Sequence, residues 1–276
     1  MEKLDRLDWV AGFSFESYGV KIGVRSNSRS VLGQLEPLLP PGWRPGSFLK
    51  VDRLYSLLIG RPSDRPGVRA FNLAYGDVTR IARAANLGDV LESFESDLQL
   101  YVAESALNRI FVHAGVVEWS NRAIVIPGRS YSGKTTLVAE LIRSGARFYS
   151  DEYAVFDRRG LVYPYSKPLS VRDLSGGQKK CPAETIGGQC GYRPIRVGAV
   201  IVSSFKAGAH WNPRTGSTGQ GMLALLANTV AARSKPDISL DAFRHSLDGA
   251  LVLTGPRGEA FEAASAILGA VDAGGK

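Results

Sequence analysis

One eight-residue segment constrains this chain more than any other feature. Residues 128–135 read Gly-Arg-Ser-Tyr-Ser-Gly-Lys-Thr, which matches the pattern G-x-x-x-x-G-K-[ST]. An apolar run that predicts a strand, Arg122–Pro127, precedes this segment, and a helical pattern, Lys134–Arg143, follows it. A strand, a glycine-rich turn and a helix in this order are typical of a phosphate-binding loop. The sequence therefore predicts that the turn binds the phosphates of a nucleotide.

The residue types in this segment fit that chemistry. Glycines let the chain turn sharply, so that backbone N–H groups and a helix N-terminus can face phosphate oxygens. Lys134 is expected to reach the β- and γ-phosphates of ATP, and the Thr135 hydroxyl to bind Mg²⁺. The predicted ATP-binding residues are Gly128, Arg129, Ser130, Tyr131, Ser132, Gly133, Lys134, Thr135 and Thr136.

Composition excludes several classes of protein. The chain has 276 residues, of which 44% are hydrophobic, so it can bury a substantial core. Its apolar runs have the length of strands and are too short to cross a bilayer, and the first residues lack the pattern of a signal peptide. Cys181 and Cys190 fit no zinc-ligand spacing and are expected to be free thiols. A cytoplasmic protein without membrane partners is the expectation.

The net charge of +8 favours an anionic partner. The basic residues are scattered, and the short pairs Arg158-Arg159 and Lys179-Lys180 have no neighbouring aromatic residues on which bases could stack. Phosphates or an acidic peptide are therefore favoured over nucleic acid.

The hydrophobic pattern divides the chain into two parts. Residues 1–104 are predicted to form an N-terminal α+β segment rich in strands, with a hairpin over 13–25 and a strand over 47–59. A long amphipathic helix over 87–109 closes this part. Residues 105–276 are predicted to form an α/β catalytic domain.

Within the second part, strands and helices alternate along the chain. Strands are predicted over 110–119, 122–127, 147–157, 195–205 and 250–254, and helices over 134–143, 219–232, 240–247 and 259–268. The glycine-rich stretch 175–191 is predicted to be a loop. Residues 212–221 have the composition of a mobile lid or of a plain loop.

Two adjacent acids follow the strand after the glycine-rich turn. Asp151 and Glu152 come 17 and 18 residues after Lys134, at the point where α/β sheets carry their catalytic groups. One acid can hold Mg²⁺ while the other accepts a proton, although a solvated turn is the alternative. His113 lies inside an apolar strand pattern, where by itself it is typical of a core histidine.

These motifs together resemble the catalytic domain of the bacterial HPr kinase/phosphorylase family. The resemblance rests on His113-Ala-Gly, residues 128–135 and Ser150-Asp151-Glu152, and on their spacing. It implies a P-loop core like that of the phosphoenolpyruvate carboxykinases, with catalytic roles for His113, Lys134 and Asp151, and with Glu152 as the base. Glu152 stands where that family has an aspartate. Family members form homo-oligomers, so a homo-oligomer is compatible with the resemblance.

Basic side chains downstream supply candidates for a clamp on phosphates or on an anionic acceptor. Lys167 and Arg172 are the first candidates, and Arg147 and Lys206 are more distant ones. A charged surface position is the alternative for each.

The sequence thus predicts an ATP- and Mg²⁺-dependent kinase that phosphorylates a hydroxyl group, that of a Ser in a peptide or small protein. Two alternatives stay open: a nucleotide-binding regulator with slow ATPase activity, and a kinase for a small molecule. Neither the acceptor nor the reversibility of the reaction follows from the residues.

Overall fold

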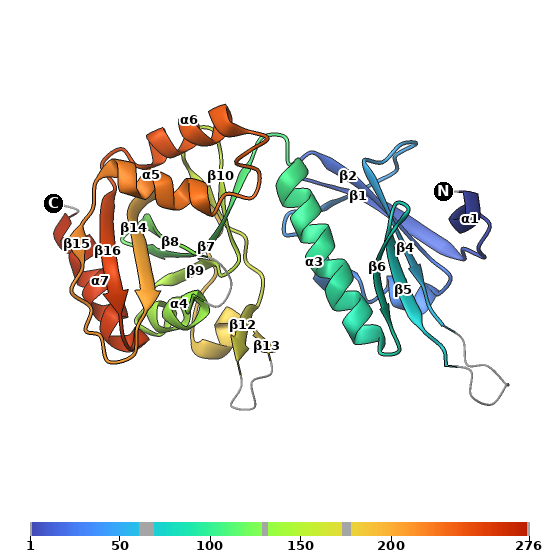
Figure 1. Cartoon of the computed structure of the whole chain (residues 1–276), viewed down its shortest axis with the longest axis horizontal. Coiled ribbons are helices and arrows are strands. Elements are labelled where there is room, and N and C mark those ends of the chain that lie inside the picture. The colour runs from blue at the N-terminus through green and yellow to red at the C-terminus, as the bar shows by residue number, and fades with distance from the viewer. Residues whose placement is uncertain (1, 61–68, 129–131, 173–177, 275–276) are drawn as a thin grey trace. The chain divides into compact units, whose positions relative to one another are not determined.

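A computed structural model describes residues 2–60, 69–128, 132–172 and 178–274. The chain forms two compact units, residues 1–108 and 109–276. The sequence pattern placed the division at 104/105, a few residues earlier. The fold is mixed α/β, with a mixed sheet in each unit (Figure 1).

The first unit is a six-stranded sheet with one long helix. Its strands run in the spatial order β3-β1-β2-β4-β5-β6. The bounds are β1 Ala11–Ser17, β2 Val20–Ser26, β3 Arg44–Gly46, β4 Arg53–Leu58, β5 Asn72–Gly76 and β6 Thr79–Ala84, with helices α1 Glu2–Asp5, α2 Arg29–Leu32, η1 Glu36–Leu38 and α3 Leu87–Ser105. β1 and β2 form the predicted hairpin, which turns at Tyr18 and Gly19.

The core of this unit lies between α3 and the sheet. Phe94 and Leu98 of α3 are fully buried and belong to one cluster with Phe15 and Tyr55 of the sheet. The spacing of the apolar residues in α3 explains this, because positions four apart lie on the same helix face.

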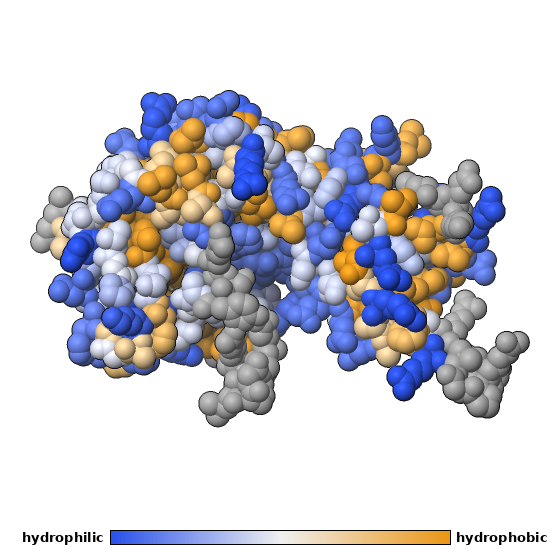
Figure 2. Space-filling view, viewed as in Figure 1, coloured by the Kyte–Doolittle hydropathy of each residue, from blue (hydrophilic) through white to orange (hydrophobic). Residues whose placement is uncertain are grey.

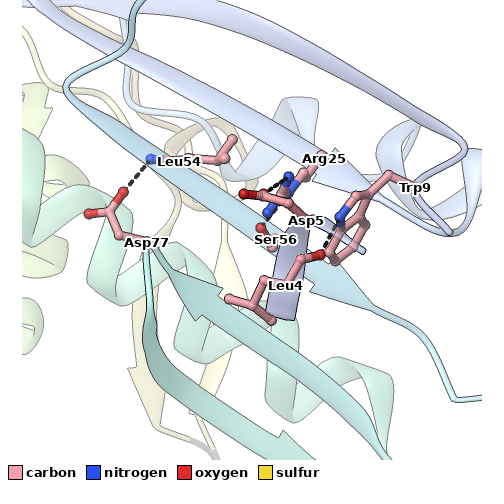
Figure 3. Close-up of polar contacts among 7 residues, drawn as sticks. All are labelled: Leu4, Asp5, Trp9, Arg25, Leu54, Ser56 and Asp77. Atoms are coloured by element: carbon pink, nitrogen blue, oxygen red, sulfur yellow. Dashed lines mark hydrogen bonds and ion pairs between the residues drawn. The ribbon is translucent and has the colours of Figure 1, made fainter. Parts of the chain in front are cut away.

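The N-terminal residues of this unit are held by one arginine (Figure 3). Arg25 of β2 donates hydrogen bonds to Asp5 and Ser56, and its guanidinium group lies 4.6 Å from the ring centre of Trp9. Trp9 in turn donates to the Leu4 carbonyl across 2.8 Å. A stacked and hydrogen-bonded arginine thus fixes the segment that precedes β1.

The second unit is built on an eight-stranded sheet. Its order is β11-β10-β7-β8-β14-β16-β15, with β9 also paired to β7. The bounds are β7 Ile110–Trp119, β8 Arg122–Pro127, β9 Arg147–Ser150, β10 Tyr153–Phe156, β11 Val162–Tyr163, β14 Arg196–Phe205, β15 Arg214–Thr215 and β16 Leu251–Arg257; β12 Leu169–Arg172 and β13 Gln178–Cys181 form a separate hairpin. The helices are α4 Lys134–Arg143, η2 Ala183–Ile186, α5 Thr218–Ala227, α6 Pro236–Ser246 and α7 Ala260–Gly274.

Strand direction brings several chain segments to one edge of this sheet. β8, β14 and β16 are parallel to one another, and β9 runs in the same direction because β8 and β9 are both antiparallel to β7. The carboxyl ends of these strands, and the start of β7, therefore lie at a common edge. Residues 128–135 and the acids Asp151 and Glu152 all follow strands that end there.

Helices cover both faces of the sheet (Figure 1). One apolar cluster joins α4 and α7 to the sheet and includes Ile126, Leu141 and Ile267. The other joins α5 and α6 to the opposite face and includes Val125 and Phe243. Neighbouring residues of β8 thus face opposite clusters, as the two-residue period of a strand requires.

The surface is mostly polar, with apolar side chains gathered over α5 (Figure 2). Leu223 of this helix is exposed. Among the described residues, no helix has both the length and the apolar composition needed to cross a bilayer.

Several predicted elements differ from the structure in their bounds. The helix predicted over 219–232 ends at Ala227, and the helix predicted over 240–247 begins at Pro236. The strand predicted over 147–157 is interrupted by a bend at Asp151 and Glu152, which divides it into β9 and β10. The helix predicted over 87–109 ends at Ser105, because Ala106 has an extended ψ of 129° and the Leu107 N–H bonds to the Tyr18 carbonyl. The strand predicted over 47–59 begins only at Arg53.

Two stretches predicted as irregular contain regular structure. Within 175–191, β13 pairs with β12 and is followed by the short helix η2. Within 212–221, Arg214–Thr215 pairs with β16 as an edge strand, and Ser217 caps α5 through a reciprocal bond with Gln220. Arg214 pairs with Thr254, which lies 40 residues further along the chain, whereas β12 and β13 form a local hairpin; composition alone reveals neither pairing.

Candidate functional site

The glycine-lysine turn leads directly into α4. Gly133 has a φ of +80°, a backbone conformation that residues with a side chain rarely adopt, and its carbonyl accepts the first helical bond, from Leu137. Lys134 is therefore the first residue of the helix and Thr135 the second. Arg129, Ser130 and Tyr131, which were predicted to bind ATP, lie outside the described residues.

Thr135 and Asp151 meet at the carboxyl edge of the sheet. The Thr135 hydroxyl donates a hydrogen bond of 2.8 Å to Oδ2 of Asp151. Asp151 lies near Thr135 because β8 and β9 pair with β7 on opposite sides and end at the same edge of the sheet. Asp151 follows β9, and Thr135 follows β8 through the glycine-lysine turn. The structure thus brings together two residues that the sequence predicted to share one metal ion.

Burial strongly affects the Asp151 carboxyl group. Its second oxygen, Oδ1, is inaccessible and has no hydrogen-bond partner among the described residues. Loss of hydration raises the pKa of Asp151 to about 6, although the Thr135 hydroxyl, the Lys134 charge and the Ser170 backbone all favour the ionised form. An oxygen left without a partner in such a place points to a ligand that completes the site.

Lys134 lies close to both acids. Burial lowers the pKa of Lys134, and the charges of Asp151 and Glu152 oppose that change. The ammonium group and the two carboxylates therefore form one interacting group of charges.

A tight bend places the two acids. The Ser150 hydroxyl accepts hydrogen bonds from the backbone N–H groups of Glu152 and Tyr153, at 3.2 and 3.0 Å. This local bond turns the chain between β9 and β10. The Glu152 side chain is exposed, whereas that of Asp151 is partly buried against α4. The partly buried Asp151 therefore suits the role of a metal ligand, and the exposed Glu152 suits the role of a proton acceptor.

His113 lies on β7 opposite Tyr153 of β10, and their ring centres are 4.9 Å apart. Burial, together with the Lys134 charge, lowers the pKa of His113, so its imidazole is neutral near neutral pH. Its backbone carbonyl accepts a 3.0 Å hydrogen bond from the Gly128 N–H. His113 is thus attached to the start of the glycine-lysine turn and is near its lysine.

Gly115 explains why a glycine follows in the motif His-Ala-Gly. A Cβ atom at this position would lie 2.5 Å from Cγ2 of Val138, which is fully buried on α4. The absence of a side chain at Gly115 lets α4 pack directly on β7. Since α4 carries Lys134 and Thr135, this close packing also sets their position.

The donors at this site suit Mg²⁺. A hydroxyl and a carboxylate are oxygen ligands of the kind that Mg²⁺ takes, and the ion keeps waters and phosphate oxygens as its other ligands. No cluster of three or more His, Cys, Asp or Glu side chains able to hold a metal occurs in the described part of the chain. The Thr135–Asp151 pair would therefore hold such an ion together with a bound phosphate.

The structure describes the side chains of three of the four basic residues that were predicted as clamp candidates. Lys167 is partly buried in the segment before β12, and Arg172 ends β12 with its side chain outside the described residues. Arg147 is not part of the site: it starts β9, at the opposite edge of the sheet from Asp151, and it pairs with Glu118. Lys206 follows β14, and its N–H bonds to the Arg257 carbonyl.

Sequence reasoning missed Arg257, the last residue of β16. Its Nη2 donates a 2.6 Å hydrogen bond to the carbonyl of Gly133. The strand was expected to stop at Thr254, because Gly255 and Pro256 usually end strands. β16 continues because its pairing with β14 extends to Arg257, beyond the two residues of β15.

No protein-family model and no curated protein sequence matches this chain.

Proposed function

We propose that this chain is an ATP-dependent kinase with a P-loop core, related to HPr kinase, that phosphorylates a serine hydroxyl of a peptide or small protein. The observation that carries the proposal is the Thr135–Asp151 hydrogen bond of 2.8 Å beside the glycine-lysine turn. The sequence assigned these residues separately to one Mg²⁺ site. The burial of Asp151 Oδ1 without a hydrogen-bond partner among the described residues supports the same assignment, because a buried carboxylate oxygen favours a positively charged partner.

In this proposal each residue has a distinct task. The backbone N–H groups of the turn and the Lys134 ammonium group bind the β- and γ-phosphates of ATP and stabilise the charge that develops on them. Thr135 and Asp151 would hold Mg²⁺, which neutralises charge on the phosphate oxygens when it is bound. His113 is neutral and lies close to Lys134, and it assists Glu152 in accepting the proton of the acceptor hydroxyl.

Glu152 is the proposed base because its carboxylate is exposed and near Lys134. It accepts the proton of the acceptor hydroxyl. The hydroxyl oxygen then forms a bond to the γ-phosphorus, and the bond between that phosphorus and the β–γ bridging oxygen breaks, so that ADP leaves.

The experiment follows label from γ-labelled ATP with Mg²⁺ and a peptide extract of the source cells, measuring labelled peptide and free phosphate separately. We expect labelled peptide with the wild type and none with Lys134→Ala. Arg244→Met, which changes an exposed residue of α6 on the other face of the sheet, should behave as the wild type. Free phosphate without labelled peptide would contradict the kinase and favour the slow ATPase. Equal labelling with Lys134→Ala would overturn the site.

A further inference from the structure

We propose that Arg257 is a positioning residue of the nucleotide site. Arg257 holds the glycine-lysine turn through the carbonyl groups of the turn, and bound phosphate balances the charge of Arg257. This inference rests on the proposed function, since it concerns the same site. It assigns a role to a strand end that the motif does not include.

The topology places Arg257 beside the turn. β16 is parallel to β14, with Arg257 opposite Phe205, and β14 is parallel to β8, which leads into the turn. Leu253 of β16 packs in the cluster with α4 and α7. Residues two and four further along a strand lie on the same face, so Arg257 is on the side of the sheet that α4 covers.

Arg257 binds backbone carbonyls where the turn enters α4. Its Nη2 lies 2.6 Å from the Gly133 carbonyl oxygen and 3.5 Å from that of Ser132. A Cβ atom at Gly133 would lie 2.5 Å from this nitrogen, so a side chain there would displace the end of Arg257, in addition to straining the positive φ. The guanidinium group is thus packed directly against the turn.

The direction of these bonds matters for phosphate binding. A turn that binds phosphate presents its N–H groups to the anion, and its carbonyl groups then face other partners. Arg257 supplies such a partner for Ser132 and Gly133, the two residues before Lys134. It therefore holds the turn in place by contacts that leave the N–H groups available.

The charge of Arg257 is only partly balanced: burial lowers the pKa of its guanidinium group, and the charge of Glu259 opposes that change without forming an ion pair. The residue is only 2% exposed, and no carboxylate in the described ranges is within ion-pair distance of its guanidinium group. Its Nε is buried without a hydrogen-bond partner among those residues, and Ser132 Oγ nearby is in the same condition. A buried cation without an ion-paired anion is unfavourable in the free protein. The phosphates of a bound nucleotide would remove that cost, so Arg257 adds to binding more than to folding.

The test separates these two effects with Arg257→Met, Arg257→Lys and the control Arg244→Met. Each protein is titrated with ATP and Mg²⁺ by calorimetry, and its thermal unfolding is followed with and without the nucleotide. We expect Arg257→Met to bind ATP about tenfold more weakly, with a smaller stabilisation by nucleotide and no loss of stability in its absence. Arg257→Lys should recover part of the affinity, and Arg244→Met should match the wild type.

Each contrary outcome is distinct. If Arg257→Met unfolds more readily without nucleotide while both it and Arg257→Lys bind ATP as the wild type does, Arg257 is merely structural and the inference fails. If Lys134→Ala loses ATP binding and both Arg257 variants keep it, the inference alone fails. If the wild type binds no ATP, the proposed function fails and the inference with it.

Discussion

The hydroxyl of Thr135 is hydrogen-bonded to the carboxylate of Asp151 at 2.8 Å, although Thr135 lies on α4 and Asp151 lies in the bend between β9 and β10. Thr135 is fixed by α4, whose packing on β7 requires Gly115. Asp151 is fixed by the bend that the Ser150 hydroxyl stabilises after β9. The pair is therefore set by two rigid elements, as a metal site needs.

The raised pKa of Asp151 predicts a change in stability with pH. Its pKa is about 6 in the folded chain and 3.8 when unperturbed, so the folded state binds more protons between these values. The contribution of this group to stability is present below about pH 4 and is lost as the pH rises through 6. Asp151→Asn keeps the shape without the charge and should be more stable than the wild type by about 3 kcal/mol at pH 7.5.

Chemical denaturation of both proteins at pH 4, 5, 6 and 7.5, without Mg²⁺, measures this difference. Other acids titrate alike in the two proteins and cancel. A difference in unfolding free energy that does not grow between pH 4 and 7 would contradict the burial of this charge.

Thr135 should be needed for its hydroxyl and not for its methyl group. Thr135→Ala removes the donor that favours the ionised form of Asp151, so the pKa of that carboxyl group rises further. We expect ATP binding with Mg²⁺ to weaken at least about tenfold in this variant, because the change removes a proposed Mg²⁺ ligand and alters the charge of Asp151 beside it. Thr135→Ser keeps the hydroxyl and should stay near the wild type.

Calorimetric titration with ATP, with Mg²⁺ and with EDTA, checks this prediction. The loss should be confined to the Mg²⁺ condition. Equal weakening in EDTA would mean that Thr135 acts on the turn and not on the metal.

The strand–turn–helix around residues 122–143 could be predicted from the sequence because all its signals are local. The apolar period, the glycines and the start of α4 lie within some twenty residues, and the structure confirms the bounds of β8 and α4. The hairpin over 13–25 was found for the same reason.

Features that depend on distant partners were missed. Nothing near Arg257 in the sequence shows that it reaches Gly133, since 124 residues separate them and only the parallel pairing of β8, β14 and β16 brings them together. The bend at Asp151 has a local cause, but a hydroxyl that accepts two backbone bonds looks like any other serine in a sequence. Long-range pairing, and not propensity, decides such features.

Gly115 should not tolerate even a methyl group. The added Cβ of Gly115→Ala would be 2.5 Å from Cγ2 of Val138, and both residues are buried between α4 and β7. Overpacking of this kind costs about 1–3 kcal/mol. Removing the opposing atoms in Gly115→Ala/Val138→Ala should make the double variant more stable than the sum of the two single changes predicts.

Urea denaturation of the four proteins completes this cycle. Activity should fall with Gly115→Ala beyond the loss of folded protein, because the displaced helix carries Lys134 and Thr135. Additive free energies would show that the two residues do not compete for the same space.

Glu152 offers the sharpest test of the reaction itself. Its side chain is exposed but its charge acts on Lys134, so Glu152→Gln should change the free energy of unfolding by no more than about 1 kcal/mol and leave ATP affinity close to that of the wild type. If Glu152 is the base, as proposed, this change should slow phosphoryl transfer by at least about 100-fold. Glu152→Asp keeps a carboxylate one methylene shorter and should retain more transfer than Glu152→Gln. Single-turnover transfer from γ-labelled ATP, with release of free phosphate followed in parallel, measures this order. If Glu152→Gln transferred phosphate as fast as the wild type, the base would have to be another group. If the wild type and Glu152→Gln both released only free phosphate at equal rates, a slow ATPase would describe the protein better than a kinase.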